Sequence, residues 1–306
     1  MTTSRRSFLK RMGQASLLYS GGAQLISELD HLDITKVSIL HTNDVHSRVD
    51  PFPMDGSRNE GLGGAAKRAA LLKKIRAKEP NTLLLDAGDI FQGTPYFNFY
   101  GGEIEMKLMS QMGYDASTIG NHDFDGGIDG LEKQMVHAKF PLIIANYGFE
   151  NTIMNGKTMP MKTFTKDKIK IGVTGVGIEL QGLVPGSLTK ETVYQDPIAR
   201  ASEYAAILKH DLKCDHVICL SHLGFKYKGN KVSDMVLAER SKDIDLIIGG
   251  HTHTFLREPA NVLNVDGKNV VVNQAGWGGI MLGRVDVYFE KNKKGKCITC
   301  RNEYIN

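Results

Sequence analysis

Five short polar clusters along the chain carry residue types that bind divalent metals. Each cluster contains Asp, His or Asn and follows a short apolar run. The clusters are Asp44-Val45-His46, Gly88-Asp89, Gly120-Asn121-His122-Asp123, Ser221-His222 and Gly250-His251-Thr252-His253. Carboxylate, imidazole and amide ligands in this combination are typical of a site for two divalent ions. Because paired ions promote displacement at phosphorus, the residue types indicate phosphoester hydrolysis.

Two of the clusters contain pairs of possible ligands at positions i and i+2. Asp44 and His46 form one pair, and His251 and His253 form the other. Side chains two residues apart in an extended strand point to the same side of it. We therefore expect each pair to face a cleft at the end of a sheet, with His251 and His253 serving one ion each.

The remaining clusters supply single ligands. Gly88 permits a sharp turn after a strand, so that Asp89 projects over the sheet edge and can bridge both ions. Asn121 offers a neutral amide oxygen, and His222 offers an imidazole at the end of another strand. With Asp44 and Asp89 as its only carboxylates, the site keeps a positive charge that favours a phosphate ester.

His122 directly follows Asn121 and is expected to lie beside the ions. An imidazole in this place can protonate the alcohol oxygen that leaves phosphorus. A neighbouring carboxylate would hold the ring and raise its pKa, and Asp123 and Asp125 are both candidates for that role. His41 lies close to the first cluster in the sequence but has no such support, so we read it as structural.

The elements that must position these residues alternate along the chain, which predicts α/β layering. The apolar runs before the five clusters predict strands over Val37–Leu40, Leu83–Leu85, Ser117–Ile119, Val217–Leu220 and Leu246–Ile248. Further strands are expected over Leu142–Ala145, Lys170–Val176, Val270–Asn273 and Arg284–Phe289. Amphipathic stretches predict helices over Gly64–Lys78, Ile104–Met112, Ile128–Ala138, Pro197–Leu212 and Ser233–Ser241. Gly- and Pro-rich stretches predict irregular loops over Asp50–Gly63 and Gly177–Gln195.

Composition narrows the class of protein. The 306 residues are 41% hydrophobic and 24% charged, which is ordinary for a globular enzyme. The net charge of +4 does not indicate the concentrated basic face of a nucleic-acid binder. Cys219 lies in an apolar run and is expected in the core. Cys297 and Cys300 have C-x-x-C spacing without a second pair, so we expect bystanders or an optional disulfide rather than a zinc ribbon.

The first 30 residues are typical of an export signal. Ser4-Arg5-Arg6-Ser7-Phe8-Leu9-Lys10 resembles the bacterial twin-arginine signal. The apolar stretch Met12–Ile26 is too short and too polar for a stable membrane span. We therefore expect a signal peptide over residues 1–30, cleaved between about Gly22 and Asp30. Residues 31–306 are expected to form one catalytic domain that acts in the periplasm.

Four motifs together resemble the calcineurin-like metallophosphoesterases, specifically the bacterial 5′-nucleotidase branch. They are Leu40-His41-Thr42-Asn43-Asp44-Val45-His46, Gly88-Asp89-Ile90-Phe91-Gln92-Gly93, Gly120-Asn121-His122-Asp123-Phe124-Asp125 and Gly249-Gly250-His251-Thr252-His253. The resemblance covers about Lys36 to Phe289. It implies a four-layer αββα sandwich with two metals at the strand ends, and the metal identity stays open among Mn, Zn, Fe and Co.

The resemblance also implies a role for each site residue. One metal would be held by Asp44, His46, Asp89 and His253. The second would be held by Asp89, Asn121, His222 and His251. His122 would be the catalytic imidazole, paired with Asp125.

One departure from the family keeps several functions open. Members of this branch usually carry a second, C-terminal domain for substrate specificity, whereas this sequence ends at Asn306. The favoured function is a 5′-nucleotidase acting on nucleoside monophosphates or related nucleotides. The alternatives are a catalytic subunit that needs a separate substrate-binding polypeptide, a 2′,3′-cyclic-nucleotide phosphodiesterase, or a thiosulfohydrolase-like enzyme. A local binding surface is also possible, made from Phe91, Tyr96, Phe97, Phe99 and Trp277.

Overall fold

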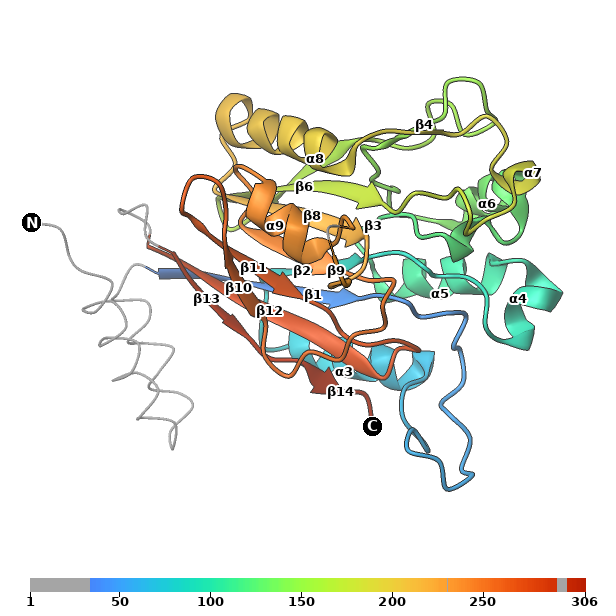
Figure 1. Ribbon diagram of the computed structural model, residues 1–306. Coiled ribbons are helices and arrows are strands. Elements are labelled where there is room, and N and C mark those ends of the chain that lie inside the picture. Colours follow the sequence, from blue (N-terminus) through green and yellow to red (C-terminus); the bar gives the residue numbers. More distant parts are fainter. Residues whose placement is uncertain (1–33, 230, 291–295) are drawn as a thin grey trace, which may run out of the picture. The chain divides into compact units, whose positions relative to one another are not determined.

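The computed structural model describes residues 34–229, 231–290 and 296–306 (Figure 1). The chain divides into two compact units. The larger unit comprises Val37–Asp286 and Thr299–Asn306, and it contains the core and the candidate site. Of the described residues, the smaller unit contains 34–36, 287–290 and 296–298; within it, the Lys36 amine lies 5.8 Å from the centre of the Tyr288 ring. The expected signal peptide, residues 1–30, lies outside the described residues.

The first sheet has the strand order β13-β12-β1-β2-β3, and β14 pairs with β12. Strands β1, β2 and β3 are parallel, so their carboxyl ends meet at one edge. The bounds are β1 (Ile34–Thr42), β2 (Thr82–Asp86), β3 (Ala116–Ser117), β12 (Met281–Glu290), β13 (Lys296–Cys300) and β14 (Glu303–Tyr304).

The second sheet has the strand order β10-β11-β9-β8-β6-β5. Its four inner strands are parallel, and the edge strands β5 and β10 run antiparallel to their neighbours. The bounds are β5 (Met161–Lys166), β6 (Ile169–Gly177), β8 (His216–His222), β9 (Leu246–Gly249), β10 (Ala260–Leu263) and β11 (Asn269–Asn273). A separate two-stranded sheet pairs β4 (Tyr147–Gly148) with β7 (Val193–Tyr194).

Helices cover the outer face of each sheet. Helix α8 packs on β6 and β8, and helix α9 packs on β9, β10 and β11 (Figure 1). Asp196 caps α8 by accepting hydrogen bonds from the backbone of Ile198 and Ala199, and Pro197 occupies its first turn, as the sequence predicts. The bounds are α3 (Ala65–Arg76), α4 (Pro95–Tyr100), α5 (Glu103–Met112), α6 (Gly127–Gln134), α7 (Gly186–Thr189), α8 (Pro197–Ala206) and α9 (Asp234–Arg240). Short 3₁₀ turns cover His122–Phe124 and Met135–His137, and a π-helical turn covers Ile207–Asp211.

Alternating side chains along β2 explain how the layers form. Leu84 packs into one cluster with residues of α3 and α5, while Leu83 and Leu85 are fully buried on the opposite face. A hydrogen bond of 2.9 Å between Asn273 on β11 and His41 on β1 joins the two sheets. The result is the predicted αββα sandwich, with a second apolar cluster under α8 and α9.

Most predicted elements are confirmed, but the strand predicted over Leu142–Ala145 is wrong. This segment makes backbone hydrogen bonds to three different places, namely Ile143 N to Ser117 O, Ile144 N to Met159 O and Ala145 N to Gly175 O. Because each bond reaches another segment, the residues form isolated bridges instead of a ladder. The predicted loop Gly177–Gln195 contains the short elements α7 and β7. Polar-rich β5 and the six-residue α4 were not expected.

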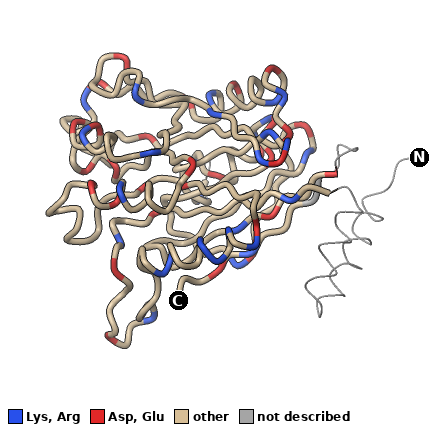
Figure 2. The backbone as a smooth tube through the Cα atoms, turned by 180° about the vertical axis from the view of Figure 1, so that it is seen from behind, with Lys and Arg blue, Asp and Glu red and all other residues tan. Residues whose placement is uncertain are grey.

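Expectations from composition can be compared with the structure where it describes the residues concerned. Cys219 is fully buried in β8, which confirms its predicted core position. The side chain of Cys297 lies outside the described residues, so the optional disulfide stays a prediction. Basic and acidic residues are spread along the described chain (Figure 2); helices α5, α6, α8 and α9 carry both signs, whereas α3 carries only Lys and Arg. Among the helices that the structure describes, none has the length and apolar character needed to cross a bilayer.

Candidate metal centre

The five polar clusters lie at the carboxyl ends of parallel strands from both sheets. Strands β1, β2 and β3 end just before Asp44, Asp89 and Asn121. In the second sheet, β8 ends at His222, and β9 ends two residues before His251. The predicted strand-end placement of the clusters is therefore confirmed, because parallel strands bring these ends to one edge.

The structure brings three of the predicted ligands into a first group. Ligand atoms of Asp44, His46 and His253 all lie within 4.8 Å of one another. The Nε2 atoms of His46 and His253 are 3.0 Å apart, and His253 Nε2 lies 3.5 Å from Asp44 Oδ1. Two imidazole nitrogens and a carboxylate oxygen thus converge on one point, as ligands of a single cation do.

A second group contains Asp89, His222 and His251, again with ligand atoms within 4.8 Å. His222 Nε2 lies 3.1 Å from Asp89 Oδ2. Asn121 joins this group, because its Oδ1 lies 2.8 Å from His251 Nδ1. Asp89 Oδ2 also lies 3.8 Å from His46 Nε2 of the first group, so its carboxylate stands between the two groups.

The backbone reaches this arrangement through left-handed conformations, which corrects the extended geometry expected from i, i+2 spacing. The positive φ angles are 50° at Asp44, 51° at His46, 55° at Asp89, 71° at His251 and 52° at His253. Residues other than glycine rarely adopt such angles, and they cluster at functional sites where the surrounding structure holds them. The i, i+2 pairs therefore converge because the chain turns after the strand and not because the strand continues.

Gly88 allows the close approach that the sequence predicts. Its φ is +86°, and a Cβ atom there would lie 2.6 Å from Gly120 N and 3.0 Å from His222 Nδ1. No larger residue fits without moving the backbone at Gly120 or the ring of His222. Gly88 therefore lets the loops after β2, β3 and β8 meet.

Backbone carbonyls fix which nitrogen of two histidines faces the site. His222 Nδ1 lies 2.7 Å from Ala87 O, and His46 Nδ1 lies 3.2 Å from Phe91 O. A carbonyl only accepts, so each Nδ1 donates, and the Nε2 lone pair of the neutral ring points into the site. His222 Nε2 is buried without a hydrogen bond and faces the Asp89 carboxylate. The space between this nitrogen and the carboxylate suits a positive charge, either the proton that the raised pKa of His222 favours or a metal ion held by the two ligand groups.

The pKa shifts of the site residues also indicate that this centre favours positive charge. Burial lowers the pKa of His222, but the charges of Asp89 and Asp44 outweigh it and raise that pKa to about 10. Burial raises the pKa of Asp44 to about 8. Burial lowers the pKa of both His251 and His253 to about 4, so these rings are neutral ligands at neutral pH. The buried carboxylates thus attract positive charge, and the residue set fits two divalent metals.

His122 lies beside the two groups and pairs with Asp125. His122 Nδ1 donates to Asp125 Oδ2 at 2.8 Å, and this hydrogen bond raises the pKa of the half-buried imidazole. The backbone N–H of His122 donates to Asp89 Oδ1 at 2.8 Å. The ring centre of His122 lies 5.2 Å from that of His46. Of the two carboxylates considered from the sequence, Asp125 is the partner of the imidazole.

Asp123 has a different task, which sequence reasoning missed. Its buried carboxylate accepts hydrogen bonds from the backbone of Asp89, Ile90, Phe91 and Gly120. It therefore holds the loop after β2 against the loop after β3. The spacing from Asn121 was visible in the sequence, but the choice between Asp123 and Asp125 depends on the 3₁₀ turn over His122–Phe124.

A second set of supporting residues also escaped sequence reasoning. Asn43 Nδ2 donates to Asp44 Oδ2 at 2.7 Å. Buried Gln274 donates to Asp234 Oδ2 at 2.7 Å and to Gly250 O at 2.9 Å, and Ser221 donates to Asp234 Oδ1 at 2.6 Å. These bonds fix the chain before His222 and before His251. The sequence offered one signal for these supporting residues, which was the presence of polar residues inside apolar runs.

The aromatic residues suggested as a local surface separate into different places. Phe91 is buried and packs against Phe97, with ring centres 5.6 Å apart. Phe99 is 79% exposed and lies on α4. Trp277 contacts the metal centre through its ring, which lies parallel to that of His253, at 8° and 5.5 Å between centres.

Comparison with known proteins identifies the family. Residues 37–255 match the calcineurin-like phosphoesterases. The chain belongs to this family. It is 34% identical to a snake venom 5′-nucleotidase from Crotalus adamanteus over 277 residues, which are 83% of this chain and 45% of the relative. It is also 34% identical to the 5′-nucleotidase of Homo sapiens, over 90% of this chain and 50% of that protein.

A solved structure supports the fold. The 5′-nucleotidase precursor from Thermus thermophilus superposes with a TM-score of 0.79 at 29% identity, covering 88% of this chain and 54% of that one. The chain therefore spans about half the length of the relatives that it matches. Calcineurin-like phosphoesterases use two divalent metals, and the two groups around Asp89 are the corresponding candidates here.

Proposed function

We propose that this chain hydrolyses phosphoesters with two divalent metals and acts on nucleoside 5′-monophosphates or related nucleotides. The observation that carries the proposal is the convergence of two ligand groups on Asp89, with the His122–Asp125 pair beside them. By this assignment Asp44, His46, Asp89 and His253 hold one metal. Asp89, Asn121, His222 and His251 hold the other.

The chemistry divides between the metals and the protein. Two bound divalent ions supply a nucleophile near neutral pH and offset the charge that develops on phosphorus. Asp125 holds Nδ1 of His122 and favours its protonated form, which leaves the other ring nitrogen as the proton donor to the leaving oxygen. The bond from His122 N to Asp89 couples the position of this acid to the ligand shared by both groups.

The substrate class follows from the relatives. Both curated relatives described above are 5′-nucleotidases, and nucleotides are therefore the first substrates to test. Because the chain spans only about half of these relatives, substrate recognition by a separate polypeptide is the main alternative. In that case activity on nucleotides appears only after the second polypeptide is added.

Cell location is a further part of the proposal. The Arg5-Arg6 motif supports export through the twin-arginine route, with residues 1–30 removed and residues 31–306 acting in the periplasm. Replacing both arginines by lysine should leave unprocessed protein in the cytoplasm. Processing of that double variant at the wild-type rate would refute this route.

The experiment that tests the activity is a phosphate-release screen with protein loaded with Mn²⁺, Zn²⁺, Fe²⁺ or Co²⁺. The substrates are AMP and other nucleoside monophosphates, 2′,3′-cyclic AMP and p-nitrophenyl phosphate. Release from AMP supports the nucleotidase, whereas release only from the cyclic ester supports the phosphodiesterase alternative. Metal-loaded protein that hydrolyses none of them would refute phosphoester hydrolysis by this chain.

A further inference from the structure

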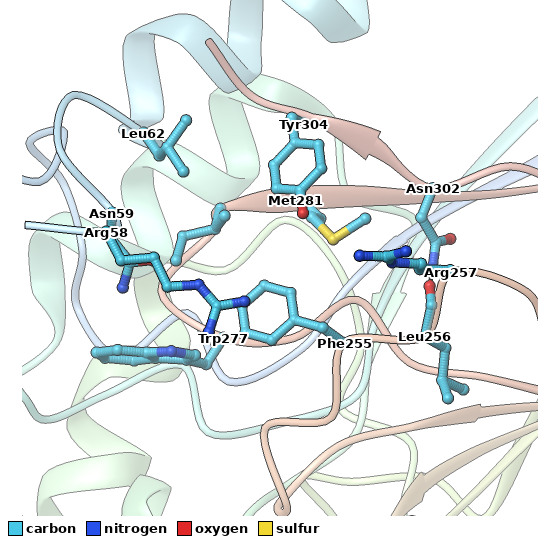
Figure 3. A pocket seen from close by; sticks show the side chains of 11 residues that line it. Arg58, Asn59, Leu62, Phe255, Leu256, Arg257, Trp277, Met281, Asn302 and Tyr304 are labelled. Atoms are coloured by element: carbon cyan, nitrogen blue, oxygen red, sulfur yellow. Dashed lines mark hydrogen bonds between the residues drawn. The ribbon is translucent and has the colours of Figure 1, made fainter.

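A pocket with no role in the proposed function lies beside the metal centre (Figure 3). Its volume is about 600 Å³, within the range of about 300–1,000 Å³ that is common for small-molecule sites. Its floor includes buried Ile280 and Met281. The polar and aromatic residues that line it are Arg58, Phe255, Arg257, Trp277 and Tyr304.

Trp277 connects this pocket to the metal centre. Its indole lies parallel to the imidazole of His253, so the pocket begins one ring away from a proposed metal ligand. Both neighbours of Trp277 are tied to the loop after β1, by Asn43 Nδ2 to Gly276 O at 2.6 Å and by Gly278 N to Asp44 O at 2.7 Å. The pocket wall and the metal-binding loop are therefore held in a fixed relation.

The positive charges of the two arginines in the pocket have no acidic partner among the described residues. Arg58 and Arg257 are exposed, and neither forms an ion pair or hydrogen bond with any residue that the structure describes. By contrast, Arg284 pairs with Glu79 at 2.7 Å and with Asp286 at 3.0 Å. A guanidinium group fits phosphate and carboxylate with parallel hydrogen bonds, so these two groups are available to an anionic ligand.

Aromatic rings lie near the two arginines. In the view of Figure 3, the ring of Phe255 lies between Arg58 and Arg257, and Tyr304 lies above it. Both rings have solvent-exposed surface, 40% for Phe255 and 56% for Tyr304. Exposed rings of this kind bind planar groups by stacking. The pocket thus offers rings for a planar group and cations for an anion.

The rim of the pocket is preorganised. Asn302 Nδ2 donates to Leu256 O at 2.8 Å, which fixes the residue between Phe255 and Arg257. Phe255 also forms an isolated antiparallel bridge with Ala275. A backbone fixed in this way loses less conformational entropy when a ligand binds.

We propose that this pocket binds the leaving group of the substrate, and that the leaving group carries both a planar base and a second phosphate. This is the chemistry of a nucleoside bisphosphate, and the inference rests on the proposed function, which places the cleaved phosphate at the metals. Phe255 and Tyr304 stack the base, and the unpaired guanidinium groups of Arg58 and Arg257 supply the positive charge that attracts the second phosphate. Hydrolysis of adenosine 3′,5′-bisphosphate then consumes one water, breaks the bond between phosphorus and O5′, and releases phosphate and adenosine 3′-phosphate.

Trp277 is the only tryptophan of the chain, so its fluorescence reports on the pocket without any turnover. Metal-loaded protein saturated with inorganic phosphate is titrated with adenosine 3′-phosphate, adenosine and ribose 5-phosphate. Adenosine 3′-phosphate should bind at least about tenfold more tightly than adenosine or ribose 5-phosphate, because only it carries both groups. Arg58→Ala and Arg257→Ala should each weaken it about tenfold and leave adenosine binding unchanged.

Arg240→Ala is the matched control, because it removes the same charge from an exposed arginine of α9 outside the pocket. It should not change any of the three titrations. Equal binding of adenosine 3′-phosphate by wild type and by the Arg58→Ala/Arg257→Ala double variant would overturn the inference.

Kinetics separate this inference from the proposed function. The wild type should hydrolyse adenosine 3′,5′-bisphosphate with a KM about tenfold below that of AMP, and the double variant should lose this difference while keeping kcat on p-nitrophenyl phosphate. If p-nitrophenyl phosphate is hydrolysed but the double variant keeps the wild-type preference, the pocket assignment is wrong and the hydrolase stands. If no ester is hydrolysed, the proposed function is wrong, and the fluorescence titration still decides whether the pocket binds.

Discussion

At the scale of single residues, Asp89 has the most central position in the candidate site. Its carboxylate faces His222 of one ligand group at 3.1 Å and His46 of the other at 3.8 Å, and it accepts the N–H of His122. It is fully buried, and the neighbouring imidazoles hold its pKa well below the usual range although burial alone would raise that pKa. A residue with contacts to both groups and to the proposed acid should not tolerate loss of its charge.

We expect Asp89→Asn to lose metal and activity together. The amide cannot supply the negative charge that a shared ligand places between two cations. Changes to outer-shell partners already cost about 10–100-fold in metal affinity, so loss of this ligand should cost more. Metal content and phosphate release are measured on the same preparation. Asp129→Asn, the same change at an exposed position paired with Lys190, is the control; full metal content in Asp89→Asn would contradict the prediction.

His122→Asn should keep its metals and turn over AMP about 10²–10⁴-fold more slowly. The reason is that His122 is assigned to protonation of the leaving oxygen and not to metal binding. p-Nitrophenol leaves without help from an acid, so the same variant should slow p-nitrophenyl phosphate far less. Equal slowing of the two substrates would remove His122 from the role of acid.

At the scale of elements, the sequence predicted the strand ends correctly because apolar runs of β-branched and leucine residues mark buried parallel strands. It could not predict the backbone that follows them. The i, i+2 rule assumes a continuing strand, whereas Asp44 and His46 lie in left-handed turns after β1. The ligands were therefore identified correctly as candidates, but the reason given for their common direction was wrong.

Pairing between elements was also beyond local patterns. Leu142–Ala145 has the composition of a strand, yet its hydrogen bonds go to β3, to Met159 and to β6. The hydrogen-bond partners of these backbone groups lie in segments that are distant in sequence, such as the strand β6 that contains Gly175. The same limit applied to Asp123, because three of its four backbone donors come from another loop, the one after β2.

The packing of β1 against β12 and β11 leads to a prediction about stability and pH. His41 is fully buried on β1, accepts a hydrogen bond from Asn273, and packs on Gly283, where any Cβ atom would overlap its ring. Burial lowers the pKa of His41 from 6.5 to about 3. Between these pH values the unfolded chain binds a proton that the folded chain does not. The free energy of unfolding should therefore fall with decreasing pH, by about 1.4 kcal/mol per pH unit from this residue.

His41→Gln removes this titration while keeping a hydrogen-bond acceptor for Asn273. Its free energy of unfolding should decline less steeply than that of the wild type as pH falls from 6.5 towards 4. Urea denaturation at several pH values measures the two slopes. Parallel slopes would mean that His41 does not titrate in this way, and His210→Gln, at an exposed histidine, provides the control.

At the scale of the whole molecule, the candidate ligands come from both sheets. Asp44, His46 and Asp89 follow strands of the first sheet, and His222, His251 and His253 belong to the second. Metals bound there would connect the sheets at one edge, in addition to the hydrogen bond between Asn273 and His41. The family motifs predicted this convergence, but the neighbouring pocket could not be predicted, because Arg58, Arg257 and Tyr304 come from separate loops and the chain terminus.

Removal of metal should therefore lower the melting temperature. A ligand at 100 times its Kd stabilises the folded state by about 2.7 kcal/mol, which for a domain of this size corresponds to about 5–11 °C. Thermal unfolding is compared for metal-loaded protein, EDTA-treated protein and EDTA-treated protein reloaded with Mn²⁺. Asp89→Asn should show no such shift. A wild-type melting temperature that is the same with and without EDTA would contradict the prediction.

The left-handed backbone at the proposed ligands carries a consequence for how this protein can evolve. Glycine adopts such φ angles without steric strain, whereas Asp and His at these positions keep a conformation that is unfavourable by about 1–3 kcal/mol each. Drift towards glycine would therefore make the apoprotein more robust while abolishing turnover, which is a trade-off between thermostability and activity. A lineage released from selection for catalysis should accumulate glycine first at positions 44, 46, 89, 251 and 253, and homologous chains with glycine there are the ones to suspect of having become inactive scaffolds.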